Sequence, residues 1–170
     1  MDTLAARLLA AKAQLQLQAP LALLEGAQAG LALVVRRIQT QGLPGRAYST
    51  NPLPKFYFQP TNAAGRAYVK REKKPTYRGI REAQGMESGF VNLTYSGRML
   101  RSLLPVPAGT VGTVVFVRVV ASDRENADKL RHNLTREGDF LAPNAQEQQT
   151  VNQVIQRRLD RAVLQALNGN

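Results

Sequence analysis

The stretch that decides the fold is Leu21–Gly42, LALLEGAQAGLALVVRRIQTQG. Apolar residues recur along it at helical spacing: Leu24, Ala27, Leu31, Val34 or Val35, and Ile38. This period predicts an amphipathic helix over about residues 21–41. Gly42 is a natural stop for it, and Arg36 and Arg37 lie in the last turn, where the helix dipole favours cations. Such a helix usually packs in a core or against a partner.

Upstream, residues 3–18 are rich in Ala, Leu and Gln. They show a second apolar face at Leu4, Leu8, Ala11 and Leu15. Because proline lacks the backbone N–H, Pro20 predicts a break between two helices. The most apolar run, residues 21–35, contains Glu25 and Gln28 and is too short and polar to span a bilayer. No secretory signal precedes it, so we expect a soluble protein made in a cytoplasm.

Residues 42–66 contain seven glycines and prolines, a density that predicts an extended arm or loop. Within this arm the sequence favours a short strand around three consecutive aromatics, Phe56, Tyr57 and Phe58. These side chains need to be buried, either in the core of this chain or on a neighbouring chain. For a single domain the core is slightly favoured, and the alternative makes them a candidate clasp between subunits.

Several shorter elements follow the arm. The predicted elements are a helix at 76–84 ending at Gly85, an extended segment at 90–94, a helix at 97–103 capped by Ser96, a largely buried strand at 110–120, and a helix at 123–134 with Asn126, Lys129 and Arg131 facing outward. Replacing the Ser96 cap with alanine is expected to cost about 1 kcal/mol.

The last helix has the clearest start signal. Asn144 at the N-cap and Glu147 three residues later form a capping-box pattern. The apolar stripe of this helix is Val151, Val154, Ile155, Leu159, Ala162 or Val163, and Ala166 or Leu167. The sequence therefore predicts a single α+β domain over residues 1–170. Amphipathic helices lie at both termini, with a small antiparallel sheet and the proline-rich arm between them.

The charge is concentrated in one segment. The chain has a net charge of +11, and residues 36–81 carry +10 of it, with Glu72 as their one acidic residue. Lysine and arginine release counterions when they meet a phosphate backbone, so this segment suits nucleic acid. A solvated loop is an equally good explanation. The candidate contacts with DNA or with an acidic partner are Lys70, Arg71, Lys73, Lys74, Arg78 and Arg81.

Catalytic chemistry is poorly represented. The sequence has no cysteine and a single histidine, His132, which excludes thiolate zinc sites and disulfides and leaves one candidate base. We find no phosphate-binding glycine loop, nucleophile elbow or zinc-protease motif. We therefore expect no catalytic residues, no metal site, no cofactor and no enzymatic activity.

Three stretches, in order, carry a family resemblance. They are Arg37–Gly42 with Tyr48–Leu53, then Tyr77–Gly85 with Val91–Leu103, and finally Asn126–Lys129 followed by Phe140–Pro143 and the last helix. Over about residues 35–165 the chain resembles the tail-completion or neck proteins of tailed double-stranded DNA bacteriophages, also described as virion morphogenesis or minor tail-component proteins. The residues that match the family motifs are Ser96, Gly97, Ser102, Phe140, Leu141 and Pro143.

The resemblance implies a structural virion protein at the head–tail junction, made in the host bacterial cytoplasm. It implies a homo-oligomeric ring, of six or twelve subunits, around a lumen through which double-stranded DNA passes without sequence-specific contacts. The implied protein partners are neighbouring neck, connector or tail-terminator proteins.

Two other functions compete with the ring. A free-standing basic nucleic-acid-binding protein would be a monomer or dimer rather than a large symmetric species. A peripheral membrane protein is disfavoured, because the first helical segment offers only Arg7 and Lys12 to anionic headgroups. We therefore expect no membrane partner.

Overall fold

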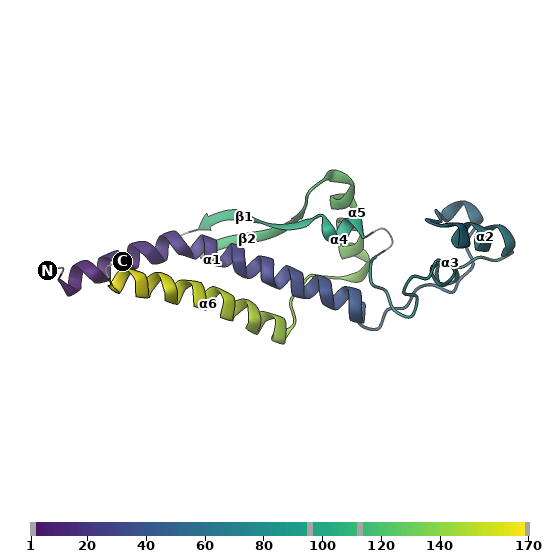
Figure 1. Ribbon diagram of the computed structural model, residues 1–170. Coiled ribbons are helices and arrows are strands. Elements are labelled where there is room, and N and C mark those ends of the chain that lie inside the picture. The colour runs from purple at the N-terminus through teal and green to yellow at the C-terminus, as the bar shows by residue number, and fades with distance from the viewer. Residues whose placement is uncertain (1–2, 95–96, 112–113, 169–170) are drawn as a thin grey trace. The chain divides into compact units, whose positions relative to one another are not determined.

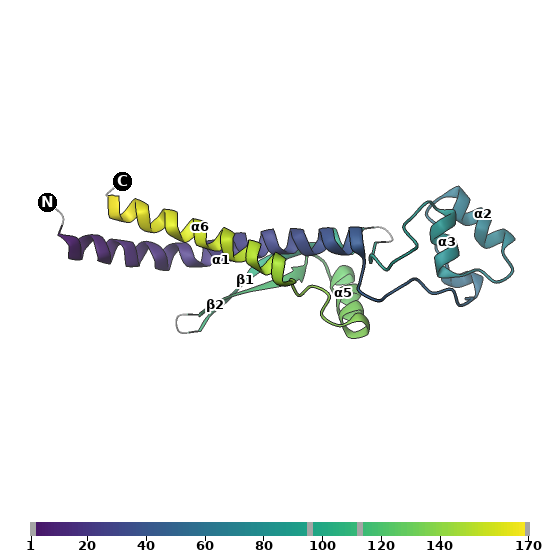
Figure 2. The ribbon, with the colours of Figure 1, turned by 90° about the horizontal axis from the view of Figure 1, so that it is seen from below.

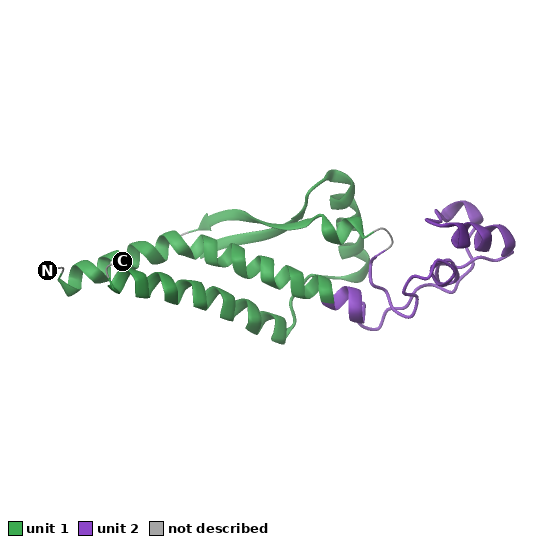
Figure 3. Cartoon of the chain, viewed as in Figure 1, with its two compact units in different colours: residues 1–36, 96–170 green, residues 37–95 purple. Residues whose placement is uncertain are grey.

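The computed structural model describes residues 3–94, 97–111 and 114–168. The chain divides into two compact units, where the sequence predicts one domain. Unit 1 comprises residues 1–36 and 96–170, and unit 2 comprises residues 37–95 (Figure 3). Unit 2 has a core of its own, made by Leu43, Phe58, Ile80 and Val91. We describe each unit by itself.

The α+β class is confirmed, with helices at both termini and a two-stranded antiparallel sheet. Unit 1 contains α1 (Leu4–Gln41, whose last turn belongs to unit 2), α4 (Arg98–Arg101), β1 (Leu103–Val111), β2 (Val114–Ala121), α5 (Arg124–Glu137) and α6 (Ala145–Asn168). Unit 2 contains the 3₁₀ turn η1 (Lys55–Tyr57), α2 (Ala63–Arg71) and α3 (Tyr77–Ala83). Figures 1 and 2 show α6 running alongside α1.

The predicted break at Pro20 is wrong, because α1 continues through it as one helix. A proline inside a helix removes one backbone hydrogen bond and crowds the preceding turn, so a compensating contact is needed. Arg158 of α6 supplies one across the proline. Its guanidinium donates to Gln18 Oε1 at 3.2 and 3.3 Å and to Glu25 Oε2 at 2.7 Å. α1 is thus continuous through Pro20 and has contacts with α6 on both sides of it.

The buried line of α1 differs from the predicted stripe. Val34 and Ile38 are buried as expected, whereas Leu24, Ala27 and Leu31 are only half-buried. The buried positions instead recur every four residues: Ala22, Gly26, Gly30, Val34 and Ile38. A period of four advances about 40° per step around a helix of 3.6 residues per turn. The buried line therefore winds slowly around α1, and small residues occupy its first half.

Glycine is needed on this line because α6 comes so close. A Cβ added to Gly26 would lie 2.6 Å from Ile155 Cγ1, and one added to Gly30 would lie 2.8 Å from Val151 Cγ2. Real side-chain carbons do not approach within such distances. The two glycines therefore form a groove in α1 that receives the branched side chains of α6.

The predictions for α6 are confirmed. Glu147 N donates to Asn144 Oδ1 at 2.9 Å, and Asn144 N donates to Glu147 Oε2 at 2.8 Å, so the capping box is complete. Every position of the predicted apolar stripe is at least half-buried. The helix therefore begins where the sequence places it and turns the expected face inward.

The strand predicted at 110–120 is confirmed over residues 114–120, which belong to β2, whereas residues 110–111 end a preceding strand, β1, that the sequence did not predict. The two strands form a β-hairpin whose register runs from Leu103 opposite Ala121 to Val111 opposite Val114. β1 contains two prolines, Pro105 and Pro107. They are tolerated because β1 is an edge strand of a two-stranded sheet. The register shifts between Pro107 and Gly109, where Gly109 has φ +111°. Contrary to the prediction, β2 is not largely buried, because Val114 and Phe116 are 54% and 46% exposed. Residues 112–113 of the predicted strand lie outside the described part of the chain.

The short motif helix is shorter than predicted, at Arg98–Arg101. Gly97 occupies its N-cap position with φ +70°, which favours glycine. Ser96, the predicted cap, lies outside the described residues. At the end of the helix Ser102 Oγ donates to Met99 O at 2.7 Å.

One surface prediction for α5 is wrong. Asn126 does not face outward but is buried, because Asp123, the N-cap, accepts hydrogen bonds from its backbone N and its Nδ2. These two bonds, the backbone one first, hold the pKa of the Asp123 carboxyl below its usual value. Lys129 and Arg131 are exposed, as predicted.

Unit 2 confirms one predicted element and corrects two others. The helix predicted at 76–84 is α3, whose N-cap Thr76 accepts from Gly79 N at 3.0 Å and which is followed by Gly85 at φ +70°. The predicted strand at 55–58 is wrong, because Lys55–Tyr57 form a 3₁₀ turn. The segment 90–94 is irregular rather than extended, since Leu93 has φ +52°.

One described helix, α1, is long and apolar enough to cross a membrane by length and composition. Its most apolar 18-residue window has a mean hydropathy of 1.3, and 22% of that window is buried. Core helices of soluble proteins and signal sequences have similar length and hydropathy, so these values alone do not identify α1 as a membrane-spanning helix.

We predict that Gly26→Leu destabilises unit 1. Overpacking against Ile155 costs about 1–3 kcal/mol, which exceeds the gain of about 1 kcal/mol from removing a glycine inside a helix. The urea midpoint, followed by far-UV circular dichroism, should therefore fall. Ala10→Leu, at an exposed position of the same helix, is the matched control and should change stability by less than about 0.5 kcal/mol. Equal midpoints for the two variants would show that α1 and α6 do not pack this closely.

Candidate functional site

The candidate site is a cationic surface on unit 2. This unit contains ten lysines and arginines and three glutamates, a net charge of +7. Five of the basic side chains are exposed on α2 and on the turn that follows it: Arg66, Lys70, Arg71, Lys73 and Lys74. Within the described part of the chain, no carboxylate forms an ion pair with any of these five. Their charge is therefore available to an anionic partner.

Capping and side-chain hydrogen bonds position α2 against α3. Asn62 caps α2 by accepting from Gly65 N at 2.8 Å. Beside it, the backbone N and the hydroxyl of Thr61 both donate to Gln84 Oε1 at 2.6 Å, which ties the start of α2 to the end of α3. At the other end, Thr76 N donates to Tyr68 Oη at 3.2 Å. The basic residues thus project from a framework held at both ends.

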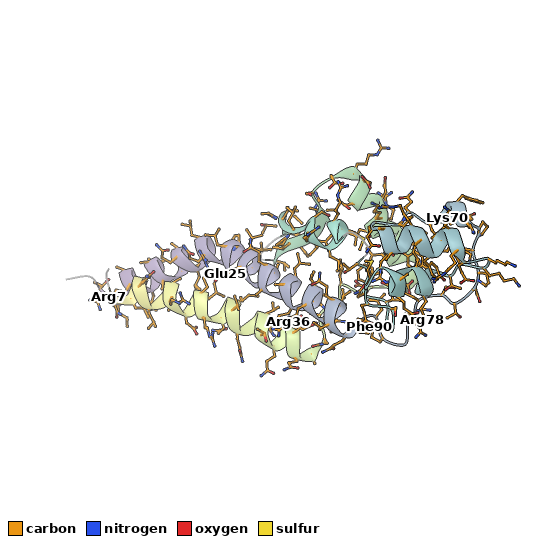
Figure 4. All side chains as sticks on the ribbon, turned by 45° about the vertical axis from the view of Figure 1, so that its right-hand side comes forward. Arg7, Glu25, Arg36, Lys70, Arg78 and Phe90 are labelled. Carbon is orange, nitrogen blue, oxygen red and sulfur yellow. The ribbon has the colours of Figure 1, made fainter. Side chains whose placement is uncertain are left out.

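Arg78 belongs to the same surface but has a local partner. It lies on α3 and forms an exposed ion pair with Glu82, one turn later, at 2.9 Å. Such i,i+4 pairs are worth only a few tenths of a kcal/mol, so an anionic ligand can compete for the guanidinium. Figure 4 labels Lys70 and Arg78 on their two helices.

Arg81 must be removed from the predicted contacts, because it is 1% exposed. Its guanidinium donates to Glu87 O at 2.6 Å, to Thr94 O at 2.9 Å and to Asn92 Oδ1 at 3.1 Å. It also lies 4.1 Å from the centroid of the Tyr48 ring, a cation–π distance. A planar group with five donors can tie together loop backbone that has no regular structure. Arg81 therefore stabilises unit 2 from inside.

Tyr48 completes this cluster. Its hydroxyl donates to Asn92 Oδ1 at 2.9 Å. Burial raises the pKa of the Tyr48 phenol, and the charge of Arg81 partly opposes the shift. Since the folded pKa lies above the ordinary value of 10.0, unit 2 loses stability as the pH rises from that value through the folded pKa.

The three aromatics of the arm separate in the structure. Phe58 is 8% exposed and belongs to the core of its own unit, so the clasp prediction is wrong for this residue. Phe56 and Tyr57 are 79% and 64% exposed. The 3₁₀ turn accounts for the difference, because it directs consecutive side chains outward before Phe58 returns. Two of the three candidate clasp residues therefore remain available to a partner.

The family-motif residues outside unit 2 have structural roles. Phe140 is buried, Leu141 is half-buried and Pro143 is exposed just before α6. His132 is exposed on α5, as expected for an uninvolved surface histidine. In the described ranges no group of three or more metal-binding side chains comes together. An open hollow beside Tyr68 and Arg78 is lined in part by the Arg78–Glu82 pair.

Comparison with known proteins adds no relative: no family model, curated protein or solved structure matches this chain. The feature of unit 2 that the sequence did not predict is the cluster formed by Tyr48, Arg81 and Asn92. Nothing in the spacing of these residues marks them as neighbours, since 33 and 11 positions separate consecutive members.

We predict that Arg81→Lys unfolds or loosens unit 2. Lysine cannot reproduce the three divergent hydrogen bonds, and the acceptors left unpaired in a buried site should cost about 3 kcal/mol or more. Hydrogen–deuterium exchange of residues 37–94 should accelerate in the variant. Arg78→Lys, on the exposed face of the same helix, should leave exchange close to that of the wild type. Unchanged exchange in Arg81→Lys would contradict the structural role of this residue.

Proposed function

We propose that this protein is a structural subunit of the head–tail junction of a tailed double-stranded DNA bacteriophage, where copies assemble into a ring around the DNA passage. The ordered motifs described above support the phage context. The observation that carries the assembly is the apolar surface that unit 1 leaves uncovered.

This surface begins on the first five turns of α1. Leu4, Leu8, Leu9 and Leu17 are 72%, 56%, 68% and 67% exposed. At 100° per residue, Leu8, Leu9 and Leu17 point in three different directions around the helix. Arg7, Lys12, Gln14 and Gln16 lie among these leucines, and Ala11 and Ala22 are the buried positions of this part of the helix. Several large apolar side chains exposed close together are a mark of a protein-binding surface. We infer that another protein surface covers the exposed leucines of α1 in the assembled state.

The β-hairpin adds to the uncovered surface. At its tip Val111 and Val114 are 71% and 54% exposed, and Phe116 on β2 is 46% exposed. An exposed sheet with β-branched and aromatic side chains invites association unless it is covered. Subunits that contact one another through α1 and the hairpin would bury these residues.

The basic surface of unit 2 supports a DNA-facing role within such a ring. It also supports the competing proposal, a free-standing nucleic-acid-binding protein. Association state separates the two, because a ring forms a large symmetric species and the free-standing protein a monomer or dimer. Binding to duplex DNA alone does not separate them.

We predict that the purified protein forms a ring of six or twelve subunits and that Leu8→Gln/Leu9→Gln/Leu17→Gln prevents its assembly. The three leucines are more than half exposed in the single subunit, so the substitutions remove their contacts in the ring and little packing within the subunit, and helicity should be unchanged. Mass photometry and negative-stain electron microscopy measure assembly, and far-UV circular dichroism measures helicity. Gln14→Ala/Gln16→Ala changes exposed polar positions on the same turns and should assemble normally.

Two outcomes would overturn the ring. A wild-type protein that stays monomeric or dimeric at micromolar concentration would favour the free-standing binder. Flotation of the wild type with lipid vesicles, lost in the leucine variant, would show that α1 binds membrane instead.

A further inference from the structure

Two features of unit 2 that are separate in sequence are joined by a hydrogen bond. Lys55 Nζ donates to Lys70 O, 2.9 Å away, in the last turn of α2. Lys55 is the first residue of η1, so the turn that carries Phe56 and Tyr57 is tied through this lysine side chain to the end of α2.

The two rings form an exposed platform. Their centroids are 4.5 Å apart and their planes are inclined at 30°. The backbone holds them in place, because Tyr57 N donates to Pro54 O at 3.0 Å and Phe58 N donates to Lys55 O at 3.2 Å. The buried ring of Phe58 anchors the far side of the turn. The backbone of the turn is thus held by hydrogen bonds, and both rings are exposed to a ligand.

We propose that η1 and the end of α2 form a binding surface for single-stranded nucleic acid. Unpaired bases stack on Phe56 and Tyr57, while Lys70, Arg71, Lys73 and Lys74 contact the phosphates. Aromatic rings next to a cationic track are the arrangement by which proteins hold single strands without reading their sequence.

The rings select this ligand over the other anionic candidates. In duplex DNA the bases are stacked on one another inside the helix, so the duplex can use the cations but not the ring faces. An acidic protein surface likewise satisfies the charges and leaves two large apolar rings exposed. Of these three ligands, a strand with unpaired bases is the one that uses both parts of the surface. This inference goes beyond the proposed ring, since passage of duplex DNA requires no unpaired base.

The test is fluorescence anisotropy on the full-length protein with a labelled single strand of about 16 nucleotides, the upper end of one binding module's site size. The same sequence as a duplex is the comparison. We expect the single strand to bind at least about tenfold more tightly than the duplex. With four phosphate contacts, its log–log salt slope should be about −3.

The variants separate stacking from charge. Phe56→Ser/Tyr57→Ser should weaken single-strand binding about tenfold or more, while the salt slope and duplex affinity stay near those of the wild type. Lys70→Gln/Lys73→Gln/Lys74→Gln should reduce the magnitude of the slope by about 2. Tyr57→Phe should bind normally. Arg124→Gln/Arg157→Gln removes two exposed charges from unit 1 and is the control for net charge.

Folding and assembly are checked in parallel. Phe58→Ser should disorder unit 2 and abolish binding, whereas Phe56→Ser/Tyr57→Ser should show the same hydrogen exchange as the wild type. Binding by the non-assembling leucine variant shows whether the surface works in a single subunit, so failure of the ring does not affect the result.

Three results would overturn the proposal. Equal affinity for single strand and duplex would show that the surface binds nucleic acid through its charge alone, without base stacking. An unchanged single-strand affinity in Phe56→Ser/Tyr57→Ser would exclude stacking, and loss of self-association in that variant would then identify the rings as a subunit clasp. If neither single strand nor duplex binds at low salt, the surface does not bind nucleic acid, and an acidic protein surface becomes the favoured partner.

Discussion

The close approach of α1 and α6 is the constraint on which the rest of unit 1 depends. Gly26 and Gly30 leave no room for a side chain between α1 and the branched residues of α6. A contact made by small residues brings two backbones together but removes little apolar area from water. The leucines beside the two glycines are half-buried, whereas Leu4, Leu8, Leu9 and Leu17, nearer the start of α1, are more than half exposed.

Unit 2 solves a different problem. Much of its chain is irregular, and irregular backbone needs hydrogen-bond partners that helices and strands supply for themselves. The buried guanidinium of Arg81 provides three donors to this backbone and to Asn92. One cation is thus used internally, while its neighbours on α2 remain exposed. The charge of the segment is consequently divided between a buried and an exposed environment, which sequence alone does not separate.

Local signals predicted the elements they control. The Asn144–Glu147 capping box, the Thr76 cap and the glycine after α1 depend on residues within a few positions of one another, and each is where the sequence places it. Pro20 shows the limit of such reasoning, because α1 continues through this local breaker and is contacted there by Arg158, 138 residues later. The hairpin was missed for a related reason, since the β-branched run contains residues of both strands: Val111 belongs to β1 and is paired with Val114 of β2.

The sequence by itself determined the α+β class, the inward face of α6 and the concentration of positive charge in the middle of the chain. These features follow from the spacing and kind of residues along the chain and need no knowledge of tertiary contacts. Only the tertiary structure decided which basic and aromatic residues reach the surface. Arg78 and Arg81 are three positions apart, and Tyr57 and Phe58 are adjacent, yet one of each pair is exposed and the other buried. That choice depends on the loops packed around Arg81 and on the 3₁₀ turn at Lys55–Tyr57, which bring together residues that no sequence pattern connects.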